Sequence, residues 1–177
     1  TRELEGIASL TNANLLVDAD FTVAKLREFL STGSYSILHI ATHGNPNYII
    51  TSNGDEVDFL GFKNILESGV SQGESNSIEM LVLSSVYAAE GTEDFPFGLP
   101  GAAMQAGVKT IVASNEIVND REAPILLPEF YEILSTDSMS KSEALRQAQL
   151  HMMSEFGIGS YRSGSTYISF HIIGDWR

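Results

Sequence analysis

The chain contains no cysteine, and this absence excludes several classes of protein. A disulfide scaffold, a thiolate zinc site, an iron–sulfur cluster and a cysteine nucleophile all need that residue. Basic residues are also scarce, with 10 Lys and Arg against 23 Asp and Glu and a net charge of −13. Nucleic acid and anionic membranes are therefore not expected as partners, because both need a basic footprint. We expect the acidic charge to be solvated surface, and the alternative is a preference for basic peptides or partners.

Long apolar runs are missing as well. The longest, such as Ile37–Ala41, have only the length of a strand, so we expect neither a membrane span nor a signal peptide. The 177 residues, 43% hydrophobic and 19% charged, predict one globular domain over residues 1–177. Because the chain begins at Thr1 and not at Met, we expect it to be a fragment of a longer protein.

Short apolar runs alternate with amphipathic helical segments. The continuous apolar character of the runs is typical of strands in a parallel sheet with both faces covered. Predicted strands are Ser36–Ala41, Met80–Ser84, Thr110–Ser114 and Ile168–Ile173, with a shorter one at Leu15–Val17. Predicted helices are Arg2–Leu10, Val23–Leu30, Phe59–Leu66, Leu99–Ala106, Ala123–Leu134 and Lys141–Phe156. Pro128 would remove a backbone hydrogen bond, which leaves a later start, near that proline, as the alternative for the fifth helix.

The dipeptide Asn53-Gly54 lies between two short segments, Tyr48–Ser52 and Asp55–Phe59. This pattern predicts a β-hairpin with a two-residue turn. The other strands and helices follow one another in an order that implies right-handed parallel crossovers. The predicted fold is therefore a three-layer α/β sandwich, with a mostly parallel sheet, helices on both faces and a small hairpin.

Ligands of open parallel sheets bind outside the carboxyl ends of the strands. His43 follows its predicted strand and is a candidate general base, the alternative being a hydrogen-bonded surface histidine. His39 lies within the strand and is expected to pack in the interior. The two histidines lack the glutamate of the helical zinc motif, so we expect no metal site and no cofactor. The segments that follow the predicted strands are Thr42–Gly44, Ser85–Tyr87, Asn115–Asp120 and Gly174–Trp176.

Seven short motifs follow one another along nearly the whole chain. They are Leu38–Gly44 (with His-x-x-x-His-Gly), Val82–Gly91, Gly98–Gly107, Val112–Asp120, Phe130–Tyr131, Ala144–Leu150 and Ile173–Asp175. In this order they resemble the CHAT domain family, caspase-like peptidase domains that are often attached to tetratricopeptide repeats. Each motif is weak alone, but seven in the family order are specific. The resemblance implies a caspase-like sandwich and a histidine and a cysteine on neighbouring strand ends.

One position departs from the family pattern. The resemblance implies that His43 is the base of a cysteine peptidase, but Val86 stands where the family has its cysteine, and Ala88 where it has a threonine. Valine can neither ionise nor attack a carbonyl group. Ser85 is a less favoured replacement, because neighbouring residues of an extended segment point to opposite sides.

Several acidic residues follow the second and third strong strands, and a rim of such charge would favour a basic side chain at the cleavage position. We expect Asp120 and Glu116 to bind it, with Asp120 the stronger candidate because it matches the family pattern. Backbone amides around Gly44 and position 86 would stabilise the oxyanion. Scattered, solvated acids are the alternative; the others in question are Glu90, Glu93 and Asp94.

Three functions are open. The preferred one is a pseudopeptidase in the cytoplasm that binds a peptide or protein partner and regulates it, or gates sensor repeats of the same parent chain. The second is an inactivated variant of a cysteine endopeptidase that cleaves after basic residues, with Val86 in place of the nucleophile. The third is an α/β module that binds a small ligand or nucleotide, which rests on fold analogy alone.

Overall fold

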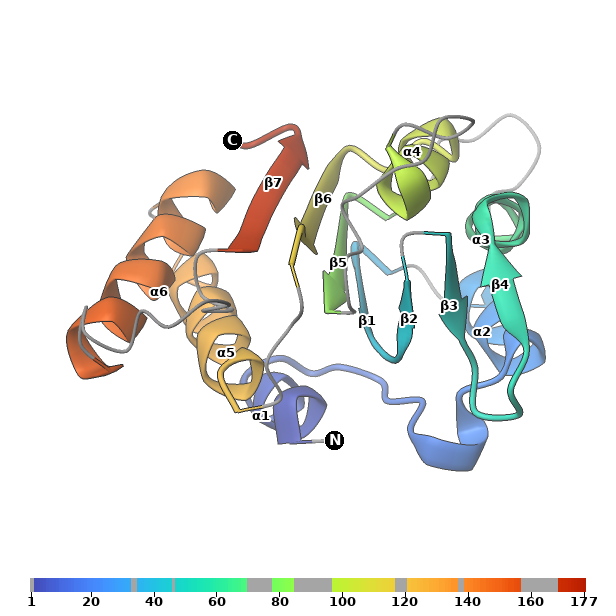
Figure 1. The fold of residues 1–177 in the computed structure, drawn as a ribbon, viewed down its shortest axis with the longest axis horizontal. Coiled ribbons are helices and arrows are strands. Elements are labelled where there is room, and N and C mark those ends of the chain that lie inside the picture. Colours follow the sequence, from blue (N-terminus) through green and yellow to red (C-terminus); the bar gives the residue numbers. More distant parts are fainter. Residues whose placement is uncertain are drawn as a thin grey trace.

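A computed structural model describes residues 2–32, 35–45, 47–69, 78–84, 97–116, 121–136, 139–156 and 169–177. Within them helices and strands alternate (Figure 1). The strands are β1 (Ile37–Ala41), β2 (Gly44–Asn45), β3 (Tyr48–Ile50), β4 (Glu56–Asp58), β5 (Met80–Ser84), β6 (Thr110–Ser114) and β7 (Phe170–Gly174). The helices are α1 (Arg2–Leu10), α2 (Val23–Thr32), α3 (Phe59–Glu67), α4 (Gly98–Gln105), α5 (Ala123–Leu134) and α6 (Lys141–Phe156), with a short 3-10 turn, η1 (Asp18–Asp20). Among these helices, none has both the length and the apolar character that crossing a membrane requires.

Four strands form the main sheet, in the order β1-β5-β6-β7. β1, β5 and β6 are parallel, as predicted, but β7 is antiparallel to β6, with Thr110 opposite Gly174 and Ser114 opposite Phe170. The prediction that Gly174–Trp176 joins the other carboxyl strand ends is therefore wrong, because this segment lies at the opposite edge, where β6 begins. An apolar run covered on both faces looks the same in either direction, so the sequence pattern could not show the reversal.

Helices cover both faces of the main sheet, which confirms the predicted three-layer arrangement (Figure 1). All residues of β5 and β6 are buried, and this accounts for their continuous apolar character. Each large side chain buried in these layers contributes about 1.5–3 kcal/mol. The core under α2, α3 and α4 contains Leu30, Leu66, Leu81, Leu99 and Ile111. The core under α1, α5 and α6 contains Ile7, Val82, Val112, Phe130 and Ala148.

The strands β2, β3 and β4 form a small antiparallel sheet that includes the predicted hairpin. Its turn differs from the prediction. The Gly54 N–H donates to the Thr51 carbonyl (2.9 Å), and the Thr51 N–H donates to the Asp55 carbonyl (3.0 Å). Gly54 has a φ of 84°, whereas Asn53 has no positive φ. The connection is thus a three-residue loop with glycine in the left-handed position, because a two-residue type I′ turn needs positive φ at both central residues.

The start of α5 is settled in favour of the longer helix. It begins at Ala123, so Pro128 lies inside it and not near its start. The proline ring packs against Gly6 of α1, where an added Cβ would lie 3.1 Å from the Pro128 Cγ. Contact between the two helices therefore offsets the backbone hydrogen bond that proline cannot make.

The predicted short strand at Leu15–Val17 does not join the sheet. Val17 is extended, with φ −120° and ψ 153°, yet none of residues 12–17 belongs to a strand. β1 is consequently an outer strand of the main sheet.

Candidate functional site

His43 follows β1 at the edge where β1 and β5 end together, since Ala41 lies opposite Ser84. The Thr42 hydroxyl donates to the Ile50 carbonyl (2.6 Å), and the Ile50 N–H donates to the His43 carbonyl (2.9 Å). These bonds fix the backbone after β1 to the end of β3. The His43 side chain is exposed and makes no hydrogen bond or ion pair with another described residue. Its imidazole is therefore accessible to a bound molecule.

Gly44 is confined by the neighbouring strand. It lies opposite Ile49, and the bond from the Ile50 N–H to the His43 carbonyl makes this a non-hydrogen-bonded pair, in which the backbones approach closely. An added Cβ would run into the Tyr48 carbonyl oxygen and lie 3.1 Å from the Ile49 Cα. The same geometry turns the Gly44 N–H away from β3. The close approach of β3 thus explains the glycine of the motif, and the Gly44 N–H points away from β3.

The third strand of this edge ends in a buried serine and an exposed acid. The Ser114 Oγ lies 2.7 Å from the Ser169 Oγ and accepts the Glu116 N–H at 3.2 Å. These contacts pin the turn after β6, and they leave the Glu116 side chain in solvent. Glu116 is the only predicted acidic site residue that the structure describes. Outside the described residues lie Ser85, Val86, Ala88, Glu90, Glu93, Asp94 and Asp120.

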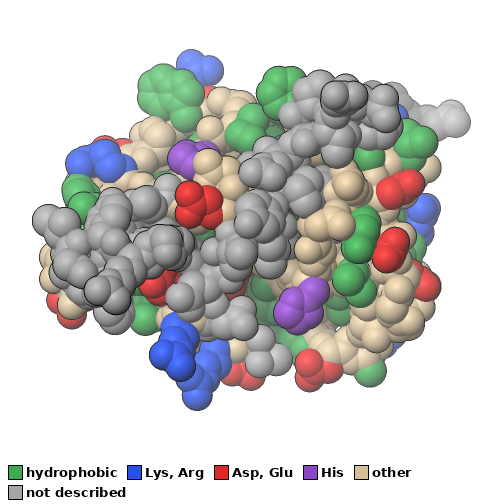
Figure 2. Space-filling model, viewed as in Figure 1, with side chains coloured by type: hydrophobic (Ala, Val, Ile, Leu, Met, Phe, Trp, Pro, Cys, Tyr) green, Lys and Arg blue, Asp and Glu red, His purple; other side chains and the backbone are tan. Residues whose placement is uncertain are grey.

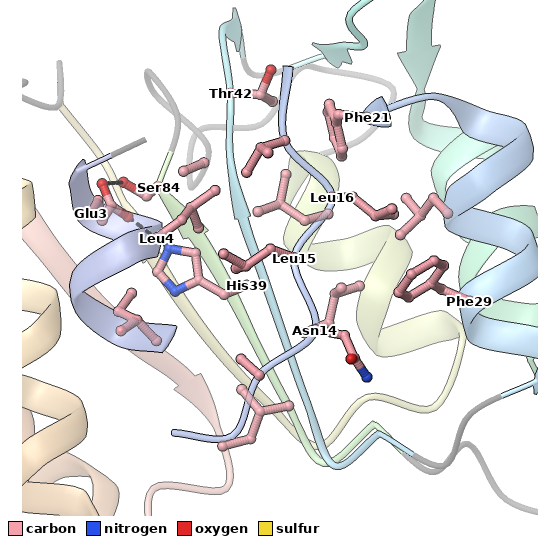
Figure 3. Close-up of a pocket in the computed structure, with 18 of the residues that line it drawn as sticks. Glu3, Leu4, Asn14, Leu15, Leu16, Phe21, Phe29, His39, Thr42 and Ser84 are labelled. Carbon is pink, nitrogen blue, oxygen red and sulfur yellow. Dashed lines mark hydrogen bonds and ion pairs between the residues drawn. The ribbon is translucent and has the colours of Figure 1, made fainter. Parts of the chain in front are cut away.

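His39 has a different environment, inside the molecule and between α1 and the sheet (Figure 3). Its side chain is 8% exposed and that of Glu3 is 9% exposed. The His39 Nε2 lies 2.7 Å from the Glu3 Oε1, and its Nδ1 lies 3.1 Å from the Tyr131 hydroxyl. The Ser84 hydroxyl donates to the other carboxylate oxygen of Glu3 at 3.0 Å. We call these four residues the His39 cluster; it joins α1, β1, β5 and α5.

A family model described as the CHAT domain matches residues 1–167 of this mostly parallel α/β sandwich. The chain belongs to the CHAT domain family. No curated protein matches it. The resemblance drawn from the motif order is thereby confirmed.

In this CHAT domain the two histidines of the His-x-x-x-His-Gly motif have separate environments. Burial, and secondarily the charge of Glu3, raises the pKa of the Tyr131 phenol, so the phenol keeps its proton. It can donate that proton to the His39 Nδ1 while the Nε2–H donates to Glu3. Both ring nitrogens of His39 are then occupied, which suits a structural histidine and not a base. The prediction that His39 packs in the interior is confirmed.

The partners of His39 were not identified from sequence. Glu3 lies 36 residues away, and the available signal was its position one turn before Ile7 on the buried face of α1. An acidic side chain on the apolar face of a helix indicates a buried polar partner, because an unpaired buried charge is costly.

A cavity of about 950 Å³ adjoins both histidines of this CHAT domain. It is lined by α1, residues 11–18, α2 and β1, and it reaches His39, His43 and Ser84. Leu15 and Leu16 lie beside it, as Figure 3 shows. On the face drawn in Figure 2 the described acidic side chains are spread over the surface, not gathered in one patch. Among the described residues no group of three or more His, Asp or Glu could hold a metal ion.

Proposed function

We propose that this CHAT domain is a pseudopeptidase, which binds a peptide or protein partner without hydrolysing it. The observation that carries the proposal is an exposed His43, without a hydrogen-bond or ion-pair partner among the described residues, in a chain whose family cysteine position is Val86. Ala41 lies opposite Ser84 in the register of β1 and β5, and His43 and Val86 each follow these residues by two positions in the sequence. A side chain with no ionisable or nucleophilic atom cannot attack a peptide carbonyl.

The neighbouring groups suit recognition of a peptide. The Gly44 N–H, turned away from β3, is a donor for a peptide carbonyl, together with the amide at position 86. Glu116 lies exposed after β6, whose carboxyl end is at the same edge of the sheet. We propose that Glu116 and Asp120 attract a basic side chain of the bound peptide.

The role that we propose is regulatory. Family members are often attached to tetratricopeptide repeats, and this association supports sensor repeats in the same parent chain, with residues 1–177 as one domain of it. We further propose a cytoplasmic location. In this scheme the CHAT domain transmits binding of a peptide or protein to its neighbours, and hydrolysis is not needed for the output.

The test is an assay with fluorogenic peptides that carry arginine or lysine at the cleavage position. We expect saturable binding with no turnover by the natural chain. The Glu116→Gln variant should bind basic peptides about twofold to fivefold more weakly, as for an exposed charge pair, and neutral peptides equally well. Turnover that disappears in His43→Ala would show an active peptidase and sink the proposal.

A second candidate is a cysteine endopeptidase whose nucleophile has been replaced. The observation in its favour is the same free imidazole beside the outward-facing Gly44 N–H, the two groups that a thiolate would need. Val86→Cys should then create cleavage that depends on the thiol and on His43, with Val86→Ala as the matched inert control. A Val86→Cys protein that cleaves nothing in a broad peptide library contradicts this candidate.

A further inference from the structure

The outer side of β1 carries backbone groups that have no partner in the part of the chain that the structure describes. The Met80 N–H donates to the Ser36 carbonyl (3.1 Å), which sets the alternation of the parallel ladder. Leu38 and Ile40 then turn their N–H and C=O groups toward β5, as Ser36 turns its carbonyl. The corresponding groups of Ile37, His39 and Ala41 face away from the sheet. Within the described residues, none of these outward groups has a hydrogen-bond partner.

The sequence of β1 itself lacks the features that usually protect an outer strand. In natural sheets, lysine, proline or a bulge in an outer strand prevents it from pairing with another chain. β1 reads Ile-Leu-His-Ile-Ala, and its register with β5 runs unbroken from Ile37 to Ala41. Large apolar side chains are exposed beside it, since Leu15 is 40% and Ile37 is 38% exposed. An apolar edge with free donors and acceptors indicates an interaction site.

A cavity accompanies the open edge where a neighbouring strand would lie. Residues 11–18 and β1 line the same cavity of about 950 Å³. Among the described residues, one hydrogen bond joins the two sides, from the Asn14 Nδ2 to the Tyr35 hydroxyl (3.1 Å) just before β1. A strand lies about 4.8 Å from its neighbour and rises about 3.3 Å per residue, so five residues would cover the length of β1.

The segment across the cavity is held at both ends. The Thr11 N–H donates to the Ile7 carbonyl at the end of α1 (3.0 Å), and the Phe21 carbonyl accepts the Ser52 N–H (2.9 Å). Leu15–Val17 therefore stays on the far wall and leaves β1 unpaired. The same wall shields β1 from a direct edge-to-edge approach by a second copy of the chain. What fits is a single extended segment.

We propose that the outer edge of β1 accepts an extended apolar strand of a partner protein, by β-strand addition. The outward N–H and C=O groups of Ile37, His39 and Ala41 bind the backbone of that strand. Its side chains alternate between two apolar walls, with Leu4 on the α1 side and Leu16 and Phe29 on the α2 side (Figure 3). Both walls select apolar residues, and β-branched ones fit a strand best. This site lies along β1, in the cavity that also reaches His43, and it does not rest on the proposed peptidase-like function.

The probe is a fluorescent peptide with about five alternating valine and isoleucine residues and a lysine at each end, matched to the length of β1. Its control is the same peptide with alternate backbone amides N-methylated, which keeps side chains and charge but removes the donors. We expect saturable binding of the first peptide and at least tenfold weaker binding of the second. Each lost backbone hydrogen bond is worth about a fivefold to tenfold change in affinity.

Two variants test the location. Leu15→Lys, in the cavity wall, should weaken peptide binding at least tenfold. Leu60→Lys makes the same substitution at a 59% exposed leucine of α3 and should leave peptide binding unchanged. Ile37→Pro removes one outward N–H at the first residue of the strand, where proline is tolerated. It should weaken binding about fivefold to tenfold with little loss of stability.

Hydrogen exchange supplies an independent readout. The amides of Ile37, His39 and Ala41 should exchange fast in the free protein and slowly with the peptide bound. Equal affinity for the N-methylated peptide, no binding at all, or equal weakening by Leu60→Lys would overturn the proposal. So would protection of these amides that rises with protein concentration in the absence of peptide, because a second copy would then occupy the edge.

Discussion

Two histidines four residues apart in one motif occupy opposite environments in this CHAT domain. His39 is 8% exposed at its side chain and has a partner for each ring nitrogen, whereas His43 is exposed and has none among the described residues. Strand periodicity alone would give both the same side, because they are an even number of residues apart. The difference arises at Thr42, where the chain leaves the sheet and bonds to β3. One motif thus combines a structural histidine with an accessible one.

The largest expected effect is a difference in stability between the His39→Ala and His43→Ala variants. His39→Ala leaves the Glu3 carboxylate without the Nε2–H donor and the Tyr131 hydroxyl without its acceptor, and each buried polar group left unsatisfied costs about 1–3 kcal/mol. His43→Ala removes an exposed side chain and should change the free energy of unfolding by less than about 0.5 kcal/mol. Urea denaturation of the two variants measures both values. Equal losses in the free energy of unfolding would contradict the assignment of His39 as structural and His43 as accessible.

A smaller effect is expected at the glycine of the same motif. Gly44→Ala places a Cβ against the Tyr48 carbonyl oxygen, and a backbone atom cannot move aside cheaply. Overpacking of this kind costs about 1–3 kcal/mol. Thermal unfolding should show a clear loss for Gly44→Ala beside an unchanged His43→Ala. A fully stable Gly44→Ala protein would contradict the close approach of β2 and β3.

The smallest effect concerns a histidine that is exposed yet paired. The His151 Nδ1 lies 2.9 Å from the Glu129 Oε1, and this hydrogen bond is the main cause that raises the pKa of His151 above 6.5. A raised pKa stabilises the folded state below pH 6.5, and the contribution is lost as the pH rises through the raised value. The unfolding temperature of His151→Gln should therefore lie below that of the unchanged protein at low pH, and the two temperatures should converge at higher pH. A difference that does not change with pH would refute the pairing.

Much of the scaffold could be predicted from the sequence, because burial gives helices a periodic apolar pattern and central strands a continuous apolar run. The bounds of α1, α5, α6, β5 and β6 agree with the predictions, since each has a clear apolar pattern. The direction of β7 was not accessible, because hydrophobicity says where a strand is buried and not which way it runs. Leu15–Val17 has the composition of a strand, but its ends are tied to Ile7 and Ser52, away from β1.

The site was accessible only in part, for a different reason. His43 and Gly44 lie next to each other in a recognisable motif, so their place after β1 followed from the chain order. The His39 cluster depends on α1, β1, β5 and α5 meeting in space, and Glu3 carries no local mark of its partner. Long-range polar contacts of this kind follow from packing, which the periodicity of one segment does not contain.

Chemical modification tests the split between the two histidines most directly. Diethyl pyrocarbonate acylates accessible neutral imidazoles, and fragmentation of the modified peptide by mass spectrometry assigns the label to His39 or His43. We predict fast labelling of His43 in the folded protein, and labelling of His39 only after unfolding. Labelling of His39 at the rate of His43, or protection of His43, would contradict the central claim that this motif holds one buried structural histidine and one free for chemistry.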